Sequence, residues 1–156
     1  MGSNRRTILL VEDDPNDVLL VQRAFRNARI ANPIHAVPHG DAAVAYLSGT
    51  GEYADRERHP LPVVILLDLK LPRRSGHEVL QWLRQQPVLK RLPVVVLTSS
   101  KETEDINRAY DLGANSYLVK PVAFDDLQQM AQTLDFYWLL LNERADLAES
   151  TNGDAA

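Results

Sequence analysis

The sequence predicts one α/β domain in which a five-stranded parallel sheet, in the doubly wound order 2-1-3-4-5, carries helices on both faces. Short apolar segments, typical of strands buried on both faces, alternate with segments whose apolar residues recur at helical spacing. Two of the strand-like segments end abruptly at acids, one at Glu12-Asp13-Asp14 and the other at Asp68. In this strand order the first and third strands are neighbours at the switch point where such sheets bind ligands. We therefore expect these acids to meet at one edge of the sheet.

The predicted elements alternate regularly along the chain. Pro15 suits the first turn of the first helix, Asp41 is a candidate cap for the second, and Ser75 lies near the start of the third. Gly113 is expected to end the fourth helix. The expected strands are 7–11, 34–37, 61–68, 94–98 and 116–119, and the expected helices are 15–25, 42–47, 76–86, 101–112 and 125–142. Strands and helices in this alternation imply a parallel sheet covered by helices.

The composition is that of an ordinary folded domain, with 45% hydrophobic and 24% charged residues and a net charge of −4. An acidic balance argues against a nucleic-acid-binding surface, and the lack of cysteine excludes disulfides and thiolate sites. No apolar stretch approaches the roughly 20 residues of a membrane span, and no signal peptide is visible, so a cytoplasmic location without membrane attachment is expected. We divide the chain into an N-terminal segment 1–5, a domain 6–142 and a flexible polar tail 143–156.

The expected strand ends carry a specific set of side chains, namely Glu12-Asp13, Asp68, Thr98 and Lys120-Pro121. This order resembles the receiver domain of two-component response regulators, a family with a flavodoxin-like fold, over roughly residues 5–142. The sequences LVEDDPND (10–17) and LDLKLP (67–72), with a lengthened loop before the third strand, are similar to single-domain regulators that partner phytochrome kinases.

The resemblance implies that Asp68 accepts a phosphoryl group from a sensor histidine kinase, with a phytochrome as the candidate kinase, in a reaction that requires Mg²⁺. Asp13 would bind the metal directly and Glu12 through water, and Asp68 and the backbone carbonyl of Lys70 would complete the protein ligands. Because crowded carboxylates repel one another, one of them is expected to hold its proton until the metal binds.

The resemblance also assigns catalytic and switch roles. Lys120 would place its positive charge on the phosphoryl oxygens, and Thr98 would donate a hydrogen bond to the same group. A cis peptide bond before Pro121 would aim the lysine into the site. In the family's mechanism Thr98 moves toward the phosphoryl group and Tyr117 turns inward behind it, which changes the surface of the last two helices and the last strand.

One position departs from the pattern of many receivers, in which the residue two positions after the acceptor is neutral or acidic. Here that residue is Lys70, near the path of the hydrolytic water, and we expect it to alter self-dephosphorylation. By analogy with the family, the kinase would dock on the first helix near Asn16, Val18 and Leu19.

The last helix has more apolar surface than one domain needs. An inward stripe consists of Leu127, Met130, Ala131, Leu134 and Trp138, yet residues 136–141 are apolar on every face. We therefore expect a homodimer through this helix, with Phe136, Tyr137, Leu140 and Leu141 in the interface. The alternative is a longer helix that folds back on its own domain.

Two other functions fit parts of the pattern. A Mg²⁺-dependent phosphohydrolase would also use an aspartate after a strand, but it usually needs a second aspartate where this chain has Lys70. A pseudo-receiver that binds partners without phosphorylation is disfavoured by Asp68, Thr98 and Lys120. We expect no enzyme activity beyond the protein's own phosphorylation and dephosphorylation. The four histidines lack metal-ligand spacing and are expected on the surface or in loops.

Overall fold

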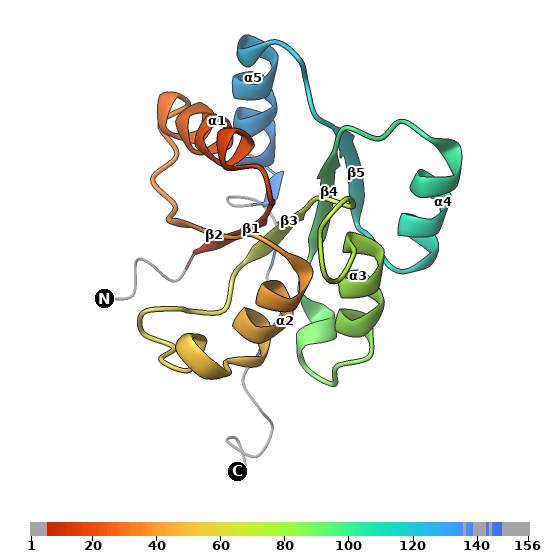
Figure 1. Ribbon diagram of the computed structural model, residues 1–156. Coiled ribbons are helices and arrows are strands. Elements are labelled where there is room, and N and C mark those ends of the chain that lie inside the picture. The colour runs from red at the N-terminus through yellow and green to blue at the C-terminus, as the bar shows by residue number, and fades with distance from the viewer. Residues whose placement is uncertain (1–5, 136, 139–142, 144, 148–156) are drawn as a thin grey trace.

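The computed structural model describes residues 6–135, 137–138, 143 and 145–147. Its centre is a parallel sheet in the order β2-β1-β3-β4-β5 (Figure 1). This order confirms the predicted fold class. The strands are β1 (Ile8–Val11), β2 (Ile34–Val37), β3 (Val64–Leu67), β4 (Val94–Thr98) and β5 (Ser116–Val119).

Helices cover both faces of the sheet. In Figure 1, α1 and α5 lie on one face, and α2, α3 and α4 lie on the other. Two short 3₁₀ helices, η2 (Gly51–Tyr53) and η3 (Leu89–Arg91), lie in connecting segments. The α-helices are α1 (Pro15–Asn27), α2 (Gly40–Ser48), α3 (Gly76–Arg84), α4 (Thr103–Asp111) and α5 (Phe124–Leu134). Within the described part of the chain, no helix is long and apolar enough to cross a membrane.

The alternation of side chains along the strands divides the core into two layers. Ile8 and Leu10 of β1 pack in the cluster that includes Phe25 of α1 and the inner residues of α5. Leu9 and Val11 of the same strand pack in the cluster that includes residues of α2 and α3. All of β1 and β3 is buried, because successive strand residues point to opposite faces and both faces are covered.

Several predicted boundaries and caps differ from the structure. The third strand begins at Val64 rather than at 61, and the regular part of the last helix ends at Leu134. Asp41 does not cap α2, because the helix begins at Gly40, two residues earlier than predicted, and His39 Nδ1 accepts the hydrogen bond from the Ala42 amide at 3.0 Å. Asp41 lies in the first turn instead and forms an ion pair with Arg74 at 3.2 Å.

The N-termini of α1 and α3 have well-formed caps. The Asp14 side chain accepts a hydrogen bond from the Asn16 amide at 2.9 Å, and Pro15 occupies the first turn. Ser75 and Glu78 form a reciprocal capping box at the start of α3. These caps stabilise the starts of α1 and α3, the helices that follow β1 and β3. They therefore help to hold the backbone of the loops that contain Glu12, Asp13 and Asp68.

The described part of the predicted tail returns to the domain. Arg91 Nη1 donates a hydrogen bond to the Asp146 carbonyl at 2.6 Å, and Leu147 packs against the core cluster on the α2–α3 face. Residues 61–63 and 91–93, which precede β3 and β4, line a pocket together with this segment. The tail therefore lies at the amino ends of the strands. Residues 148–156 lie outside the described part, and the flexibility predicted for 143–156 stays a prediction.

Candidate functional site

The candidate site lies where the strands end. All neighbouring strands are parallel, so their carboxyl ends share one edge of the sheet. The Asp68 amide donates a hydrogen bond to the Val11 carbonyl at 3.1 Å, which places the end of β3 beside the end of β1. The Lys120 amide donates to the Thr98 carbonyl at 2.8 Å, which places the end of β5 beside the end of β4. The sheet register therefore brings together residues more than a hundred positions apart.

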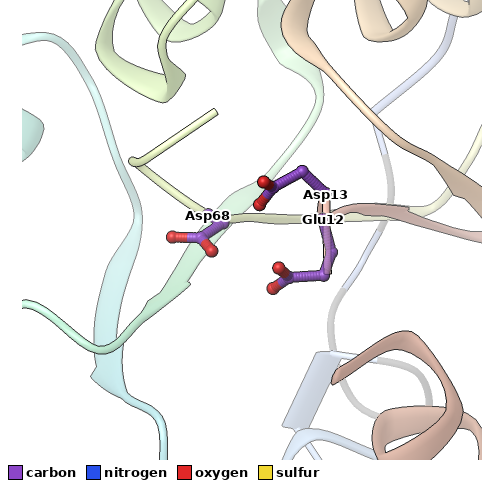
Figure 2. A group of neighbouring side chains, drawn as sticks. All are labelled: Glu12, Asp13 and Asp68. Carbon is purple, nitrogen blue, oxygen red and sulfur yellow. The ribbon is translucent and has the colours of Figure 1, made fainter. Parts of the chain in front are cut away.

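Three carboxylates converge at this edge. Glu12, Asp13 and Asp68 each offer one oxygen atom, and these atoms all lie within 4.8 Å of one another. Figure 2 shows the side chains pointing toward the same space, with Asp68 opposite the other two. Glu12 and Asp68 are buried, whereas Asp13 is exposed. Oxygen-only donors with one side open to water suit Mg²⁺, which keeps several waters when it binds.

Both oxygens of Asp68 are already engaged in hydrogen bonds. Thr98 Oγ1 donates to Oδ1 at 2.7 Å, and the Lys70 amide donates to the same oxygen at 3.3 Å. Lys120 Nζ donates to Oδ2 at 3.1 Å. The structure thus places the predicted acceptor, Thr98 and Lys120 in direct contact. The Lys70 side chain is exposed, and the role of its carbonyl as a metal ligand stays a prediction.

Lys120 has a further partner that the sequence analysis missed. Its ammonium contacts Glu12 Oε1 at 2.5 Å and Asp17 Oδ2 at 2.8 Å, in addition to Asp68. Asp17 lies in the first turn of α1, and Pro15 and the Asp14 cap set the direction of that helix. The sequence did contain a clue to this contact. Asp17 is an acid in the first turn of a helix that begins at the edge of the site, so its side chain can point into the site.

The electrostatics follow from burying several like charges beside one cation. Burial raises the pKa of Glu12 from 4.5 to about 7, against the lowering effects of the Lys120 hydrogen bond and the Asp14 amide. Burial alone would lower the pKa of Lys120, but hydrogen bonds to Asp17 and Glu12 and the charge of Asp68 raise it above its ordinary value. Lys120 is therefore a permanent cation, and Glu12 is the acid that holds its proton near neutral pH.

The expectation of a cis bond before Pro121 is not met. No peptide bond among the described residues is cis, so Lys120 and Pro121 are joined by a trans bond. Trans is the ordinary isomer for this bond. The lysine side chain reaches three carboxylates from this backbone, so a cis bond is not required to direct it into the site.

Tyr117 lies behind the site in a hydrogen-bonded network. Its hydroxyl donates to the Ser100 carbonyl at 3.1 Å, and burial raises its pKa. Ser100 Oγ donates to Asp105 Oδ2 at 2.6 Å, which ties the loop after β4 to the first turn of α4. His77 Nε2 lies 3.3 Å from the Asp105 carbonyl and connects α3 to the same turn. The predicted switch role of Tyr117 stays a prediction.

The histidines do not all lie where the sequence suggested. His77 is only 6% exposed, because its ring fills the contact between α3 and α4, so its prediction as a surface residue is wrong. His35 is in β2 and half-buried. Its ring and that of His59 both pack on Tyr46, with centroid distances of 5.7 and 5.8 Å.

The predicted kinase-docking surface lies within the described residues, whereas most of the predicted dimer interface does not. Val18 and Leu19, with Pro15 and Pro38, line a groove beside Glu12 and Asp13, and Leu19 is exposed. Of the predicted dimer residues, Phe136, Leu140 and Leu141 lie outside the described residues. Tyr137 is described and is 52% exposed.

Comparisons with known proteins agree with this geometry. The family model "Response regulator receiver domain" matches residues 8–132. Response regulator Rcp1 of Synechocystis sp. is 43% identical over 86% of this chain and 89% of its own length.

Two solved structures are similar over nearly their whole length. The phosphorylated cyanobacterial phytochrome response regulator RcpA has a TM-score of 0.83 and 38% identity, and the match covers 90% of this chain and 99% of RcpA. The Mn²⁺-bound form of Rcp1 has a TM-score of 0.80 and 41% identity over the same shares of the two chains.

Proposed function

Because the chain belongs to the response regulator receiver domain family, we propose that it receives a phosphoryl group on Asp68 from the phosphohistidine of a sensor kinase. The observation that carries the proposal is the contact of one buried carboxylate with both Thr98 and Lys120, beside two further acids. A stable fold does not require three acids to converge, whereas phosphoryl transfer to a carboxylate does require charge to be neutralised.

The chemistry uses the groups as they lie. A carboxylate oxygen of Asp68 attacks phosphorus, the P–O bond forms while the P–N bond breaks, and the electron pair returns to the imidazole nitrogen. Lys120 stays protonated through the step, since its pKa is raised, and stabilises charge on the phosphoryl oxygens. Thr98 is fully buried, and its hydroxyl lies on the reacting carboxylate, where it would donate to the phosphoryl group once that group is attached.

The metal is proposed to be Mg²⁺, held by Asp13 and Asp68, by Glu12 through water and by the Lys70 carbonyl. The oxygen-only donor set supports a hard divalent cation. A solved structure of the similar protein Rcp1 contains Mn²⁺, another divalent cation. Bound Mg²⁺ would neutralise negative charge on the phosphoryl oxygens.

The proposed partner is a histidine kinase of the phytochrome type, in the cytoplasm. RcpA is described as a phosphorylated phytochrome response regulator, and its similarity covers nearly its whole chain. The groove that includes Val18 and Leu19 lies beside the acids and supports docking of the kinase there. A homodimer through the end of α5 is proposed on the exposed Tyr137 and the apolar sequence around it.

Intact mass after incubation with acetyl phosphate and Mg²⁺ tests the proposal. We expect an adduct of one phosphoryl group that is absent in Asp68→Asn and in samples with excess chelator. Asp14→Asn is the matched control, since it removes a neighbouring acid whose cap an asparagine can replace. Steady release of phosphate without an adduct would indicate a phosphohydrolase, and an inert protein would indicate a pseudo-receiver.

A further inference from the structure

Four aromatic rings pack together where the connection before β3 meets α2 and β2. His35 lies in β2, Tyr46 lies in α2, and Tyr53 and His59 lie in the connecting segment 51–60, which is beside α2 in Figure 1. The centroids of neighbouring rings are 5.2 to 5.8 Å apart. Among the described residues, no ring contact of this cluster reaches the acidic site, so the cluster has no part in the proposed phosphoryl transfer.

The segment 51–60 is held on the domain by side chains. Arg56 donates hydrogen bonds to the Tyr46 and Leu47 carbonyls of α2, both at 2.7 Å. The Tyr46 hydroxyl donates to the Pro60 carbonyl at 2.8 Å. The backbone amides at positions 53, 54 and 59 donate to carbonyls at positions 50, 51 and 55 rather than to the sheet. The segment can therefore leave α2 without breaking a strand pairing.

Neither imidazole of the cluster has an acid that would balance a positive charge. Glu52, Asp55 and Glu57 of the same segment are exposed, and in the described part of the chain none of them forms an ion pair with a histidine. The nearby charge is positive instead, because Arg56 donates to the His59 carbonyl at 3.1 Å. A second proton would also place two cations in rings whose centroids are 5.8 Å apart.

A proton on these rings opposes the packing of the segment. An imidazolium donates from both nitrogens, but His59 Nδ1 is buried and has no hydrogen-bond partner. A buried donor without an acceptor costs more than the attraction of a tyrosine face for a cation returns. Burial and the charge of His59 lower the pKa of His35. Burial raises the pKa of Tyr46 to about 12 and also raises that of Tyr53, so neither phenol ionises to offset a cation.

We propose that residues 51–60 form a pH-sensitive strap, which neutral His35 and His59 hold against α2 and β2 and which protonation of these rings releases. The pKa of His35 is lower in the folded protein than its ordinary value of 6.5, so the packed strap is fully favoured above pH 6.5. It loses stability as the pH falls through the folded value. Release uncovers one side of Tyr46, which is 0% exposed in the packed state, next to the edge strand β2.

Hydrogen exchange of the full chain, read by mass spectrometry of peptides, tests the strap between pH 7.5 and 5.0 after correction for intrinsic exchange. Opening that takes up one proton becomes about tenfold more favourable per pH unit. Protection of the strap should therefore fall by up to about tenfold per unit below pH 6.5, while protection of α3 stays constant. In His35→Phe/His59→Phe, whose rings pack but do not titrate, the strap should be equally protected at both pH values.

His39→Asn is the matched control. It removes a third histidine near α2 but keeps a side chain that can cap the helix, so its strap should respond to pH as in wild type. Asp68→Asn should also keep the response, because the strap does not depend on phosphorylation. Loss of the response in Asp68→Asn would overturn the strap and leave the proposed function untouched.

A second measurement needs no variant. Proton NMR of wild type should show the His35 ring titrating below pH 6.5 and the backbone amides of the strap shifting with the same midpoint. Strap amides that do not follow His35, or protection that falls equally in the double phenylalanine variant, would overturn the proposal. So would constant protection in wild type, or a loss spread evenly over the strap and α3, which would indicate unfolding of the whole domain.

Discussion

Thr98 and Lys120 hold the two oxygens of Asp68 before any phosphoryl group is present. Each hydrogen bond is made to a buried carboxylate, where charge-assisted hydrogen bonds are stronger than those between neutral groups. The acceptor is thereby oriented in advance, so the reaction does not have to organise it. This preorganisation is the basis of the residue-scale predictions.

Thr98→Ala should slow phosphorylation without abolishing it. The variant loses the donor 2.7 Å from Asp68 Oδ1, and a hydrogen bond to a charged group contributes about 1.5–3 kcal/mol, which is roughly a ten- to hundredfold change in rate. The rate of adduct formation with acetyl phosphate, read by intact mass, measures the change. Thr98→Ser keeps the hydroxyl and is the control. A rate in Thr98→Ala equal to wild type would remove the hydroxyl from the reaction.

Metal affinity should rise with pH through about 7. Glu12 is protonated below its raised pKa of about 7, and that proton must leave before the carboxylate can help to bind a cation. Calorimetric titration with Mg²⁺ in buffers of different ionisation enthalpy should show proton release on binding, greatest below pH 7. In Glu12→Gln the proton release should disappear. Proton release that persists in this variant would assign the proton to another group.

The same shift affects stability with a definite sign. The pKa of Glu12 is higher in the folded protein than its ordinary value of 4.5, so between pH 4.5 and about 7 the folded state binds more protons. This group therefore lowers the stability of the metal-free protein as pH rises through that interval. Thermal unfolding of wild type and Glu12→Gln across the interval should show a steeper decline in wild type.

At the scale of elements, the loop between β3 and α3 couples the acceptor to a helix start. Gly76 begins α3, and its amide donates to the Leu69 carbonyl at 2.9 Å. A Cβ atom at Gly76 would lie 2.2 Å from the Asp68 carbonyl oxygen, which is backbone and cannot rotate away. The backbone that carries the acceptor is therefore packed directly against this glycine.

Gly76→Ala should destabilise the protein by roughly 1–3 kcal/mol, the usual cost of overpacking, and should also slow phosphorylation, because relief of the clash moves Asp68. Chemical denaturation and adduct formation measure the two effects. Gly51→Ala is the control, since a Cβ there meets open space and only the left-handed backbone is penalised. Phosphorylation unchanged in Gly76→Ala would show that Asp68 does not depend on this packing.

The elements could be predicted from the sequence because their signals are local. Apolar strand segments and the helix starts near Pro15 and Ser75 depend on near neighbours in the chain, and the parallel sheet follows from the alternation of elements. The contacts of Asp17 and His77 depend on the direction of one helix relative to another strand or helix. The Asp41 cap was wrong because α2 begins at Gly40, which makes His39 the capping residue.

At the scale of the whole molecule, the residues linked to the predicted partners lie in or next to α1 and α5. The α1 and α5 face contains the start of α1, with Asp17, and the exposed Leu19. Tyr137, which is exposed, follows three residues after the end of α5. The sequence around Tyr137 is rich in apolar residues, and contiguous apolar patches on a surface often mark interaction sites.

A homodimer through this end of α5 should be visible by sedimentation. We expect wild type to sediment as a dimer at micromolar concentration and the double variant Phe136→Asp/Leu140→Asp to sediment as a monomer, because charges oppose burial of an apolar interface. Leu19→Asp, at an exposed apolar position on α1, is the control and should stay dimeric. A monomeric wild type would instead favour a helix folded back on its own domain.

The described tail segment held by Arg91 lies beside the amino ends of β3 and β4. The acids occupy the opposite rim, so the whole length of the strands separates the two. A fluorophore attached at position 147 would therefore lie at the end of the sheet opposite the reactive carboxylate. Such a reporter could follow modification of Asp68 without blocking the approach of a bulky donor.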